Sequence, residues 1–361
     1  MKTNVKKLLS LALALSLVLA VCLTGCGPKE SEPAPSVEPS PSVEPTPSAE
    51  PTAERAAVNL AVLSGPTGVG AAKLMADNLN DATGNAYTVT LCTDNQQVMA
   101  GLTNGEFDIA AVATNVAANL YHKSNGAIQM AAINTLGVLY ILGPADQPIT
   151  SLSELKGKTL YATGQGANPE YVLNYLLDQS GVAGDVNIVW QAPEEVTATM
   201  LQGEGQYCML PVPAATALEA KSEGKLTAQI SLSDAWNALE NGSKLTMGCM
   251  VVRTAFAQEH PETVREFLRE YAASIEYMSE PGNLADETEM NPAQLVADFG
   301  IAPSAAIARK AIPQCNLVYL DGVDMRSAIQ GYYEVLYAAD PAAIGGAIPD
   351  DAFYLMPDQA D

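Results

Sequence analysis

The chain has 361 residues, with 41 aspartates and glutamates against 18 lysines and arginines and a formal net charge of −23. This excess of acid argues against binding to nucleic acid and against docking on anionic lipid, because both attract basic surfaces. Only two histidines occur, His122 and His260, and they lie far apart in the sequence, so a zinc site or a Ser/His/Asp triad is hard to assemble.

The N-terminus has the features of an export signal. Lysines precede an apolar stretch at residues 8–21, which is too short to span a membrane. Small residues then lead to a cysteine at residues 23–26, as a lipoprotein signal peptidase requires. We therefore expect residues 1–25 to be a lipoprotein signal peptide and two acyl chains on Cys26 to anchor the protein to the cytoplasmic membrane, at the cell surface or in the periplasm. An ordinary secretory signal that happens to contain cysteines is the alternative.

Residues 26–56 are predicted to form a tether. They repeat proline, serine, glutamate, alanine and threonine and contain almost no apolar residues to bury, so they cannot offset their own ordering entropy. Proline favours extended polyproline II, so we expect a disordered segment that holds a domain away from the membrane. A glycosylated, mucin-like stalk would have the same mechanical role.

The rest of the chain contains an internal near-repeat. Residues 59–115 and 158–213 each read as strand, glycine-rich turn, helix, strand, helix, Gly-Glu turn and strand. Alternating strands and helices imply mostly parallel sheets covered by helices, so the sequence predicts an α/β fold with two related lobes. Chance similarity between two α/β units is the alternative.

Two apolar runs, residues 131–143 and 245–253, could carry the chain between the lobes. Residues 261–278 have apolar side chains on one face and predict an amphipathic helix, and the C-terminal part is expected to return to the first lobe. We place residues 57–142 and 247–361 in the first lobe and residues 143–246 in the second.

Four cysteines remain in the folded part, without a CxxC pair: Cys92, Cys208, Cys249 and Cys315. Three of them lie in apolar, strand-like runs. We favour free, buried cysteines that act as small apolar residues, with a disulfide as the alternative.

Four turns stand where ligands bind in open α/β sheets, beyond the carboxyl ends of strands and at helix N-termini: residues 64–68, 113–115, 163–166 and 211–213. Any one of them alone is more often only a tight turn, but there are two in each lobe. Their glycines allow close approach to the backbone, and their hydroxyls and amides are neutral donors and acceptors. With Tyr140 added, the candidate ligand-binding residues are Ser64, Gly65, Pro66, Thr67, Gly68, Thr114, Asn115, Tyr140, Thr163, Gly164, Gln165, Gly166 and Pro211. We expect no catalytic residue, metal ligand or cofactor.

Several sequence motifs are shared with one group of known proteins: the cysteine motif at residues 23–26 and residues 65–70, 105–110, 146–157, 163–167, 251–253 and 260–264. In these motifs the chain resembles a type II solute-binding protein of an ABC importer, nearest to the nitrate/sulfonate/taurine and thiamine-precursor group. The resemblance implies two lobes, two hinge strands and closure around a small organic molecule. It also implies an ABC permease and its ATPase as partners, and we expect a monomer that touches the membrane only through its lipid.

The four turns differ from those of anion-specific members because none contains arginine, lysine or histidine. A sulfonate or nitrate would have to rely on helix N-termini and neutral donors. Aromatic side chains could instead supply ring surfaces for a planar heterocycle, although most are expected in the core: Tyr140, Tyr161, Tyr171, Tyr207, Trp190 and Trp236.

Two other functions compete with delivery to a permease. One is an enzyme on the same fold, such as a menaquinone-pathway dehydratase or a pyrimidine-synthesis relative. Glu170 and Asp108 are its only acid or base candidates, and we interpret Glu170 as serving the first turn of a helix and Asp108 as structural. The other is a ligand sensor that reports to a different membrane protein.

Overall fold

The computed structural model describes residues 55–356. The predicted signal peptide, Cys26 and nearly all of the tether lie outside the described residues. The described residues lie within one compact unit. Within residues 55–356, no helix is both long enough and apolar enough to cross a membrane.

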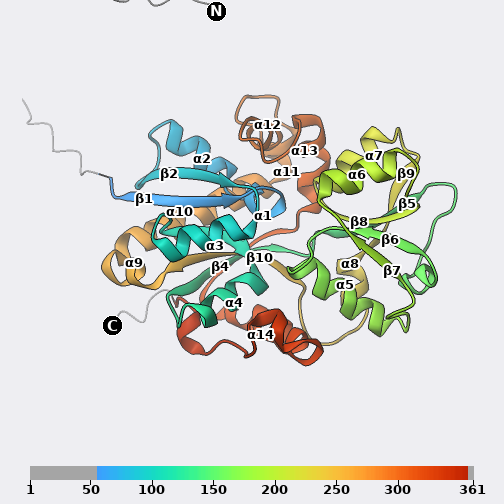
Figure 1. Ribbon diagram of the computed structural model, residues 1–361. Helices are drawn as coiled ribbons and strands as arrows, with labels where there is room; N and C mark the ends of the chain where they lie inside the picture. The colour runs from blue at the N-terminus through green and yellow to red at the C-terminus, as the bar shows by residue number, and fades with distance from the viewer. Residues whose placement is uncertain (1–54, 357–361) are drawn as a thin grey trace, which may run out of the picture. The chain divides into compact units, whose positions relative to one another are not determined.

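The first sheet has six strands in the order β11-β4-β10-β3-β1-β2. Strand β10 lies between β3 and β4, antiparallel to both, while β1 is parallel to β2 and β3. A strand from late in the sequence therefore fills the middle of a sheet that begins near the N-terminus (Figure 1). The strands are β1 (Ala57–Leu63), β2 (Ala86–Cys92), β3 (Ile109–Ala113), β4 (Ile128–Leu136), β10 (Thr246–Arg253) and β11 (Leu317–Leu320).

The second sheet has five strands in the order β7-β6-β8-β5-β9. Strand β6 is parallel to β7 and β8, and β5 is antiparallel to β8 and β9. The predicted α/β architecture with two sheets is therefore confirmed. The strands are β5 (Leu139–Pro144), β6 (Thr159–Ala162), β7 (Asn187–Trp190), β8 (Tyr207–Pro211) and β9 (Leu226–Ser231).

The apolar run at residues 131–143 is divided between the two sheets. Strand β4 ends at Leu136 in the first sheet and β5 begins at Leu139 in the second, ahead of the predicted start of the second lobe at residue 143. Gly137 makes this short crossing possible, because a Cβ there would lie 2.1 Å from the Ser233 hydroxyl oxygen. The exact lobe bounds remain a prediction.

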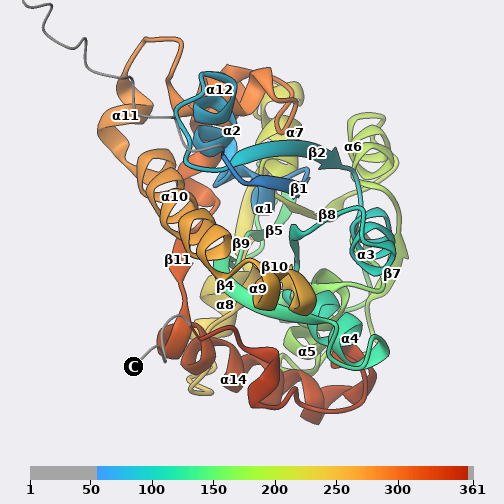
Figure 2. The ribbon, with the colours of Figure 1, turned by 90° about the vertical axis from the view of Figure 1, so that its left-hand side faces the viewer.

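Helices flank the strands of both sheets (Figures 1 and 2). The amphipathic helix predicted at residues 261–278 is α10, which buries an apolar face that includes Phe267, Tyr271 and Met278 and lies against β11 and α2. The helices are α1 (Pro66–Val69), α2 (Ala72–Leu79), α3 (Asn95–Asn104), α4 (Thr114–Lys123), α5 (Asn168–Gln179), α6 (Pro193–Leu201), α7 (Ala214–Lys221), α8 (Leu232–Asn237), α9 (Thr254–Glu259), α10 (Pro261–Ser279), α11 (Pro281–Ala285), α12 (Pro292–Asp298), α13 (Ala305–Ala311) and α14 (Gly322–Ala339).

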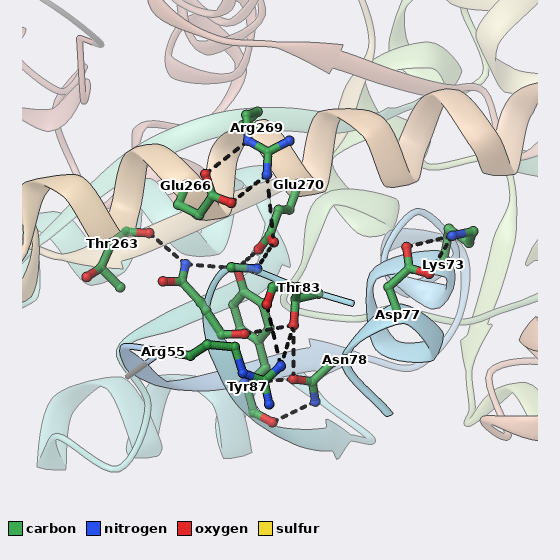
Figure 3. A network of polar contacts seen from close by, with 12 residues as sticks. Arg55, Lys73, Asp77, Asn78, Thr83, Tyr87, Thr263, Glu266, Arg269 and Glu270 are labelled. Carbon is green, nitrogen blue, oxygen red and sulfur yellow. Dashed lines mark hydrogen bonds and ion pairs between the residues drawn. The ribbon is translucent and has the colours of Figure 1, made fainter. Parts of the chain in front are cut away.

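A buried polar network ties α10 to the turn before β2 (Figure 3). The Glu270 carboxylate accepts hydrogen bonds from the Gly84 N–H and the Tyr87 hydroxyl, each at 2.5 Å. The Asn85 side chain donates to the Tyr87 hydroxyl at 3.0 Å and to the Thr263 carbonyl at 2.9 Å. Because each buried group has a partner, the network stabilises this side of the first sheet without leaving an unpaired charge.

All four cysteines of the described chain are free and buried, as predicted. Burial raises the pKa of the Cys208 and Cys315 thiols to about 12 and also raises the pKa of Cys249. Because thiolates rather than thiols react, these cysteines should be inert in the folded protein.

We expect a thiol-specific chromogenic reagent at neutral pH to modify none of the four cysteines in the folded protein and all four after unfolding in guanidinium. The measurement uses the chain from residue 26 onward with Cys26→Ser, so that these four cysteines are the only thiols present. Protected thiols should react only as fast as the structure opens. Rapid reaction of one thiol under native conditions would show that its surroundings are open.

Candidate functional site

The four predicted turns lie at four strand-to-helix junctions, two in each sheet. In the first sheet the junctions are β1 to α1 and β3 to α4; in the second they are β6 to α5 and β8 to α7. Neighbouring parallel strands run in the same direction, so these junctions lie together at the carboxyl ends of the strands, where ligands of α/β proteins bind. We call this end of a sheet its carboxyl edge. The structure thus arranges the predicted turns as two sets, one at the carboxyl edge of each sheet.

The two edges are joined through Asn168, the first residue of α5, which is completely buried. Its amide nitrogen donates to the Thr114 hydroxyl at 2.7 Å and to the Met247 carbonyl at 2.9 Å. Its amide oxygen accepts from the Tyr332 hydroxyl at 3.1 Å. Asn168 therefore connects the second sheet to β10, α4 and α14.

Asn115, at the start of α4, completes this junction. The Asn168 N–H donates to the Asn115 side-chain oxygen at 3.1 Å, and the Asn115 N–H donates to the Asn168 side-chain oxygen at 3.3 Å. We call this reciprocal pair the asparagine clasp. Because the Asn115 side-chain nitrogen also donates to the Ala343 carbonyl at 3.3 Å, the polar groups of Asn115 are engaged inside the protein.

Of the predicted ligand-binding residues, Thr114 is likewise engaged. It is fully buried, and its hydroxyl donates to the Thr246 carbonyl at 2.8 Å while it accepts from Asn168. Thr114 and Asn115 thus hold the two edges together in this structure.

Four other predicted side chains keep their polar groups free. Within residues 55–356 the side chains of Ser64, Thr67, Thr163 and Gln165 form no hydrogen bond. Ser64 and Thr67 come from the first sheet and the other two from the second. Because the backbone around them is fixed while their donors are unused, they are the strongest candidates for contact with a neutral polar ligand.

The position of Thr67 is set from two sides. The Asn134 side chain in β4 donates to the Thr67 carbonyl at 3.3 Å and to the Tyr271 hydroxyl at 2.9 Å. On the other side Gly248 of β10 allows close approach, because a Cβ there would lie 2.9 Å from the Thr67 hydroxyl oxygen. Gly68 needs to be glycine for a similar reason, since its Cβ would lie 2.2 Å from the Leu63 carbonyl oxygen.

The second-sheet turn is shaped by two glycines with left-handed backbone conformations. Gly164 and Gly166 have φ angles of 90° and 76°. The Gly166 N–H is not free, because it donates to the Glu170 carboxylate at 2.6 Å. Glu170 therefore serves the first turn of α5, as interpreted from the sequence.

Asp108 is also a structural residue, as predicted. Its carboxylate pairs with the Arg253 guanidinium at 2.6 Å and accepts from the Asn59 N–H at 2.9 Å. Asp108 is 6% exposed, so this is a largely desolvated ion pair that fixes β10 beside β1 and β3.

Tyr140 and Pro211 lie beside the crossing between the sheets. Leu139 pairs with Pro211 in the β5–β8 ladder, which places Pro211 next to the crossing. Tyr140 lines a cavity whose other lining residues include none of the predicted ligand-binding residues. The structure therefore separates Tyr140 from the free hydroxyls. Trp236, another aromatic candidate, is completely buried between Tyr175 and Tyr332.

Sequence reasoning missed Asn134 and Asn168. Both are polar residues. Asn134 interrupts the apolar run of β4, and Asn168 follows a glycine-rich turn and directly precedes Pro169. An asparagine at the end of a buried strand, where every polar group needs a partner, is the signal that could have identified Asn134. Nothing in the sequence indicated that Asn168 would reach the other sheet.

Comparison with known families gives one match. Residues 89–283, more than half of the chain, match the family model described as NMT1/THI5 like. No curated protein matches the sequence.

Several solved structures have a similar fold. An ABC transporter structure from Parabacteroides distasonis is 22% identical, with a TM-score of 0.67 and coverage of 84% of this chain and 99% of that chain. The periplasmic aliphatic sulphonate binding protein SsuA from Escherichia coli is 14% identical, with a TM-score of 0.65 and coverage of 85% and 94%. The ligand-binding component of an ABC-type import system from Staphylococcus aureus, with zinc bound, is 14% identical, with a TM-score of 0.63 and coverage of 84% and 97%.

Proposed function

The chain belongs to the NMT1/THI5-like family, and from this premise we propose that it is the substrate-binding subunit of an ABC importer, which captures a small organic molecule between its two sheets and delivers it to a permease. The observation that carries the proposal is the pair of carboxyl edges, one in each sheet; we call the proposed binding site at these edges the cargo cleft. Each edge presents unpaired side-chain donors, Ser64 and Thr67 on one and Thr163 and Gln165 on the other. No acid or base is needed for capture, and Asp108 and Glu170 are both held in internal contacts.

The proposed ligand is recognised chiefly by neutral groups. The turns that carry the free donors contain no charged side chain, so a fully ionised ligand would bring its charge to a site without a counter-charge. Hydroxyl and amide groups suit an uncharged polar molecule such as a heterocycle with ring nitrogens and exocyclic oxygens. Helix N-termini at the same edges would add partial positive charge for any acceptor on the ligand.

The proposed location follows from residues outside the described part of the chain. The export signal and the cysteine at position 26 support a lipid-anchored protein outside the cytoplasmic membrane. The tether would let the binding unit reach a permease in the same membrane. The proposed partners are that permease and its ATPase, with the protein acting as a monomer.

A thermal-shift screen tests capture in this site. The soluble chain, residues 26–361 with Cys26→Ser, would be heated with pyrimidines, thiamine, flavins, nucleosides, sulfonates and nitrate in turn. A ligand at a hundred times its dissociation constant should stabilise the folded state by about 2.7 kcal/mol, which gives a clear rise in melting temperature.

The location of binding is tested with isosteric variants. Thr67→Val and Thr163→Val each remove one hydroxyl, and each should weaken the ligand about three- to tenfold, the equivalent of one neutral hydrogen bond. Thr103→Val, on the exposed side of α3, is the matched control and should bind as the unmodified protein does. A ligand that is insensitive to both cleft variants would show that the cargo binds elsewhere.

A further inference from the structure

A cavity lies where the chain passes between the sheets, and we call it the crossover cavity. It encloses about 410 Å³. Its wall combines the end of β4 and the residue before β11, on the side of the first sheet, with the start of β5, the end of β9 and helix α8, on the side of the second. Lys244 and Leu245, which lead the chain back into β10, complete it. A ligand here would touch both sheets and both crossings.

The wall of the crossover cavity is held in place by specific contacts. Asn316, just before β11, donates from its side chain to the Gly137 carbonyl and accepts from the Leu136 N–H at 3.1 Å. Gly137 lies so close to the start of α8 that an added Cβ would meet the Ser233 hydroxyl oxygen at 2.1 Å and the Leu245 side chain at 2.8 Å. The crossing is thus fixed against both neighbours, and the cavity is a formed part of the fold.

The cavity contains one acid and one base that do not pair. Within residues 55–356 the side chains of Asp234 and Lys244 form no ion pair or hydrogen bond, with each other or with any other residue. The Tyr140 hydroxyl is also without a partner in that part of the chain. Burial, followed by the nearby Asp234 charge, raises the pKa of Tyr140, in keeping with a neutral phenol that stands close to the carboxylate.

We propose that the crossover cavity binds a free α-amino acid, as a site separate from the cargo cleft. The ligand carboxylate would meet Lys244, its ammonium would meet Asp234, and its side chain would lie against the Tyr140 ring. A ligand with both charges satisfies both side chains, whereas an anion or an amine alone leaves one of them unmatched. The cavity has the volume of a small-molecule site.

The inference does not depend on the nature of the cargo. Apart from Tyr140, none of the predicted ligand-binding residues lines the cavity. Asp234 and Lys244 are exposed to solvent, so each ionic contact is screened and binding should be weak. The site would therefore respond to amino acids at high concentration, and its occupancy would favour the arrangement of the two sheets that forms the cavity.

The test uses saturation-transfer NMR and titration on the soluble chain with Cys26→Ser. The probes are the common free L-amino acids, with acetate and ethylamine as ligands that carry only one of the two charges. We expect at least one amino acid to bind, and neither single-charge compound to bind at the same concentration. Lys244→Ala and Asp234→Asn should each weaken the binding of that amino acid by about three- to fivefold, because each removes one exposed, solvent-screened ionic contact.

Two control variants separate binding in the crossover cavity from binding in the cargo cleft and from a general effect of surface charge. Lys225→Ala removes another exposed lysine, and Thr67→Val alters the cargo cleft; both should leave amino-acid affinity within about twofold. Unchanged melting temperatures would confirm that Lys244→Ala and Asp234→Asn are folded. The proposal is overturned if no amino acid binds, if binding survives both charge variants, or if Thr67→Val weakens it while they do not.

Discussion

Replacing Asn168 with alanine is expected to lower the free energy of unfolding by about 3 to 5 kcal/mol, the range for disruption of a buried polar network. The substitution removes one half of the asparagine clasp, the bond from the Asn115 N–H to the Asn168 side-chain oxygen, while the Asn168 N–H remains. It also removes the Asn168 contacts to the Met247 carbonyl and the Tyr332 hydroxyl, which are buried, and leaves the Thr114 hydroxyl with only its bond to the Thr246 carbonyl. Urea denaturation followed by circular dichroism measures the change.

The matched control is Asn187→Ala in β7. Asn187 is exposed and makes a single side-chain contact with the Thr159 hydroxyl at 3.2 Å, so its loss should change stability by about 0.5 kcal/mol or less. The clasp also predicts coupling: Asn115→Ala and Asn168→Ala together should cost less than the two single effects added. Additive effects, or an Asn168→Ala variant as stable as the control, would show that the clasp does not hold the edges together.

The protein should lose most of its stability between about pH 10 and pH 12, because of its buried tyrosines. Tyr87, Tyr271, Tyr332 and Tyr333 are each less than 10% exposed, and burial raises the pKa of all four well above the ordinary value of about 10. For Tyr87, the bond to Glu270 raises the pKa further (Figure 3). In the unfolded chain these phenols would ionise near pH 10.

The direction of the pH dependence follows from the difference between the tyrosine pKa values in the folded and unfolded states. The stabilisation is fully present below pH 10, because both states are then protonated, and it is lost as pH rises because only the unfolded state releases protons. Each buried tyrosine contributes at most about 1.4 kcal/mol per pH unit, so four can cancel a typical stability of about 5 to 15 kcal/mol within about one to three pH units.

Denaturation measured as a function of pH, together with phenolate absorbance, tests this expectation. Phenolate should form in step with unfolding rather than before it. Tyr271→Phe removes one buried phenol and should flatten the dependence of stability on pH, whereas Tyr337→Phe, at a side chain that is 40% exposed, should not. Phenolate absorbance from the buried tyrosines in a protein that is still folded would contradict the interpretation.

The sequence predicted those parts of the molecule that depend on local pattern. Alternating strands and helices, the amphipathic face of α10, the buried cysteines and the structural roles of Asp108 and Glu170 all follow from residue type and spacing. The sequence did not distinguish Thr67 and Thr163, whose hydroxyls stay free, from Thr114 and Asn115, whose polar groups are used internally. That difference is created by Asn168 and Tyr332, which reach the junction from distant parts of the chain.

The crossing between the sheets is a second feature that the sequence alone could not predict. A largely apolar run at residues 131–143 suits one long strand or two short ones, and pattern alone cannot choose between them. The choice is made by Gly137 packed against Ser233, a contact across almost a hundred residues. Tyr140 consequently lines the crossover cavity, apart from the turns with which it was grouped.

The central position of β10 also governs the order in which the protein can fold. All strands of the second sheet come from residues 139–231, so that sheet can form as soon as this stretch of chain is present. The first sheet instead needs β10 between β3 and β4, and pairings this distant in sequence form slowly. Until residues 246–253 arrive, β3 and β4 have open, apolar inner edges of the kind that recruit other chains. The first sheet is thus the last to be completed, and it is the part most exposed to aggregation during synthesis of the chain.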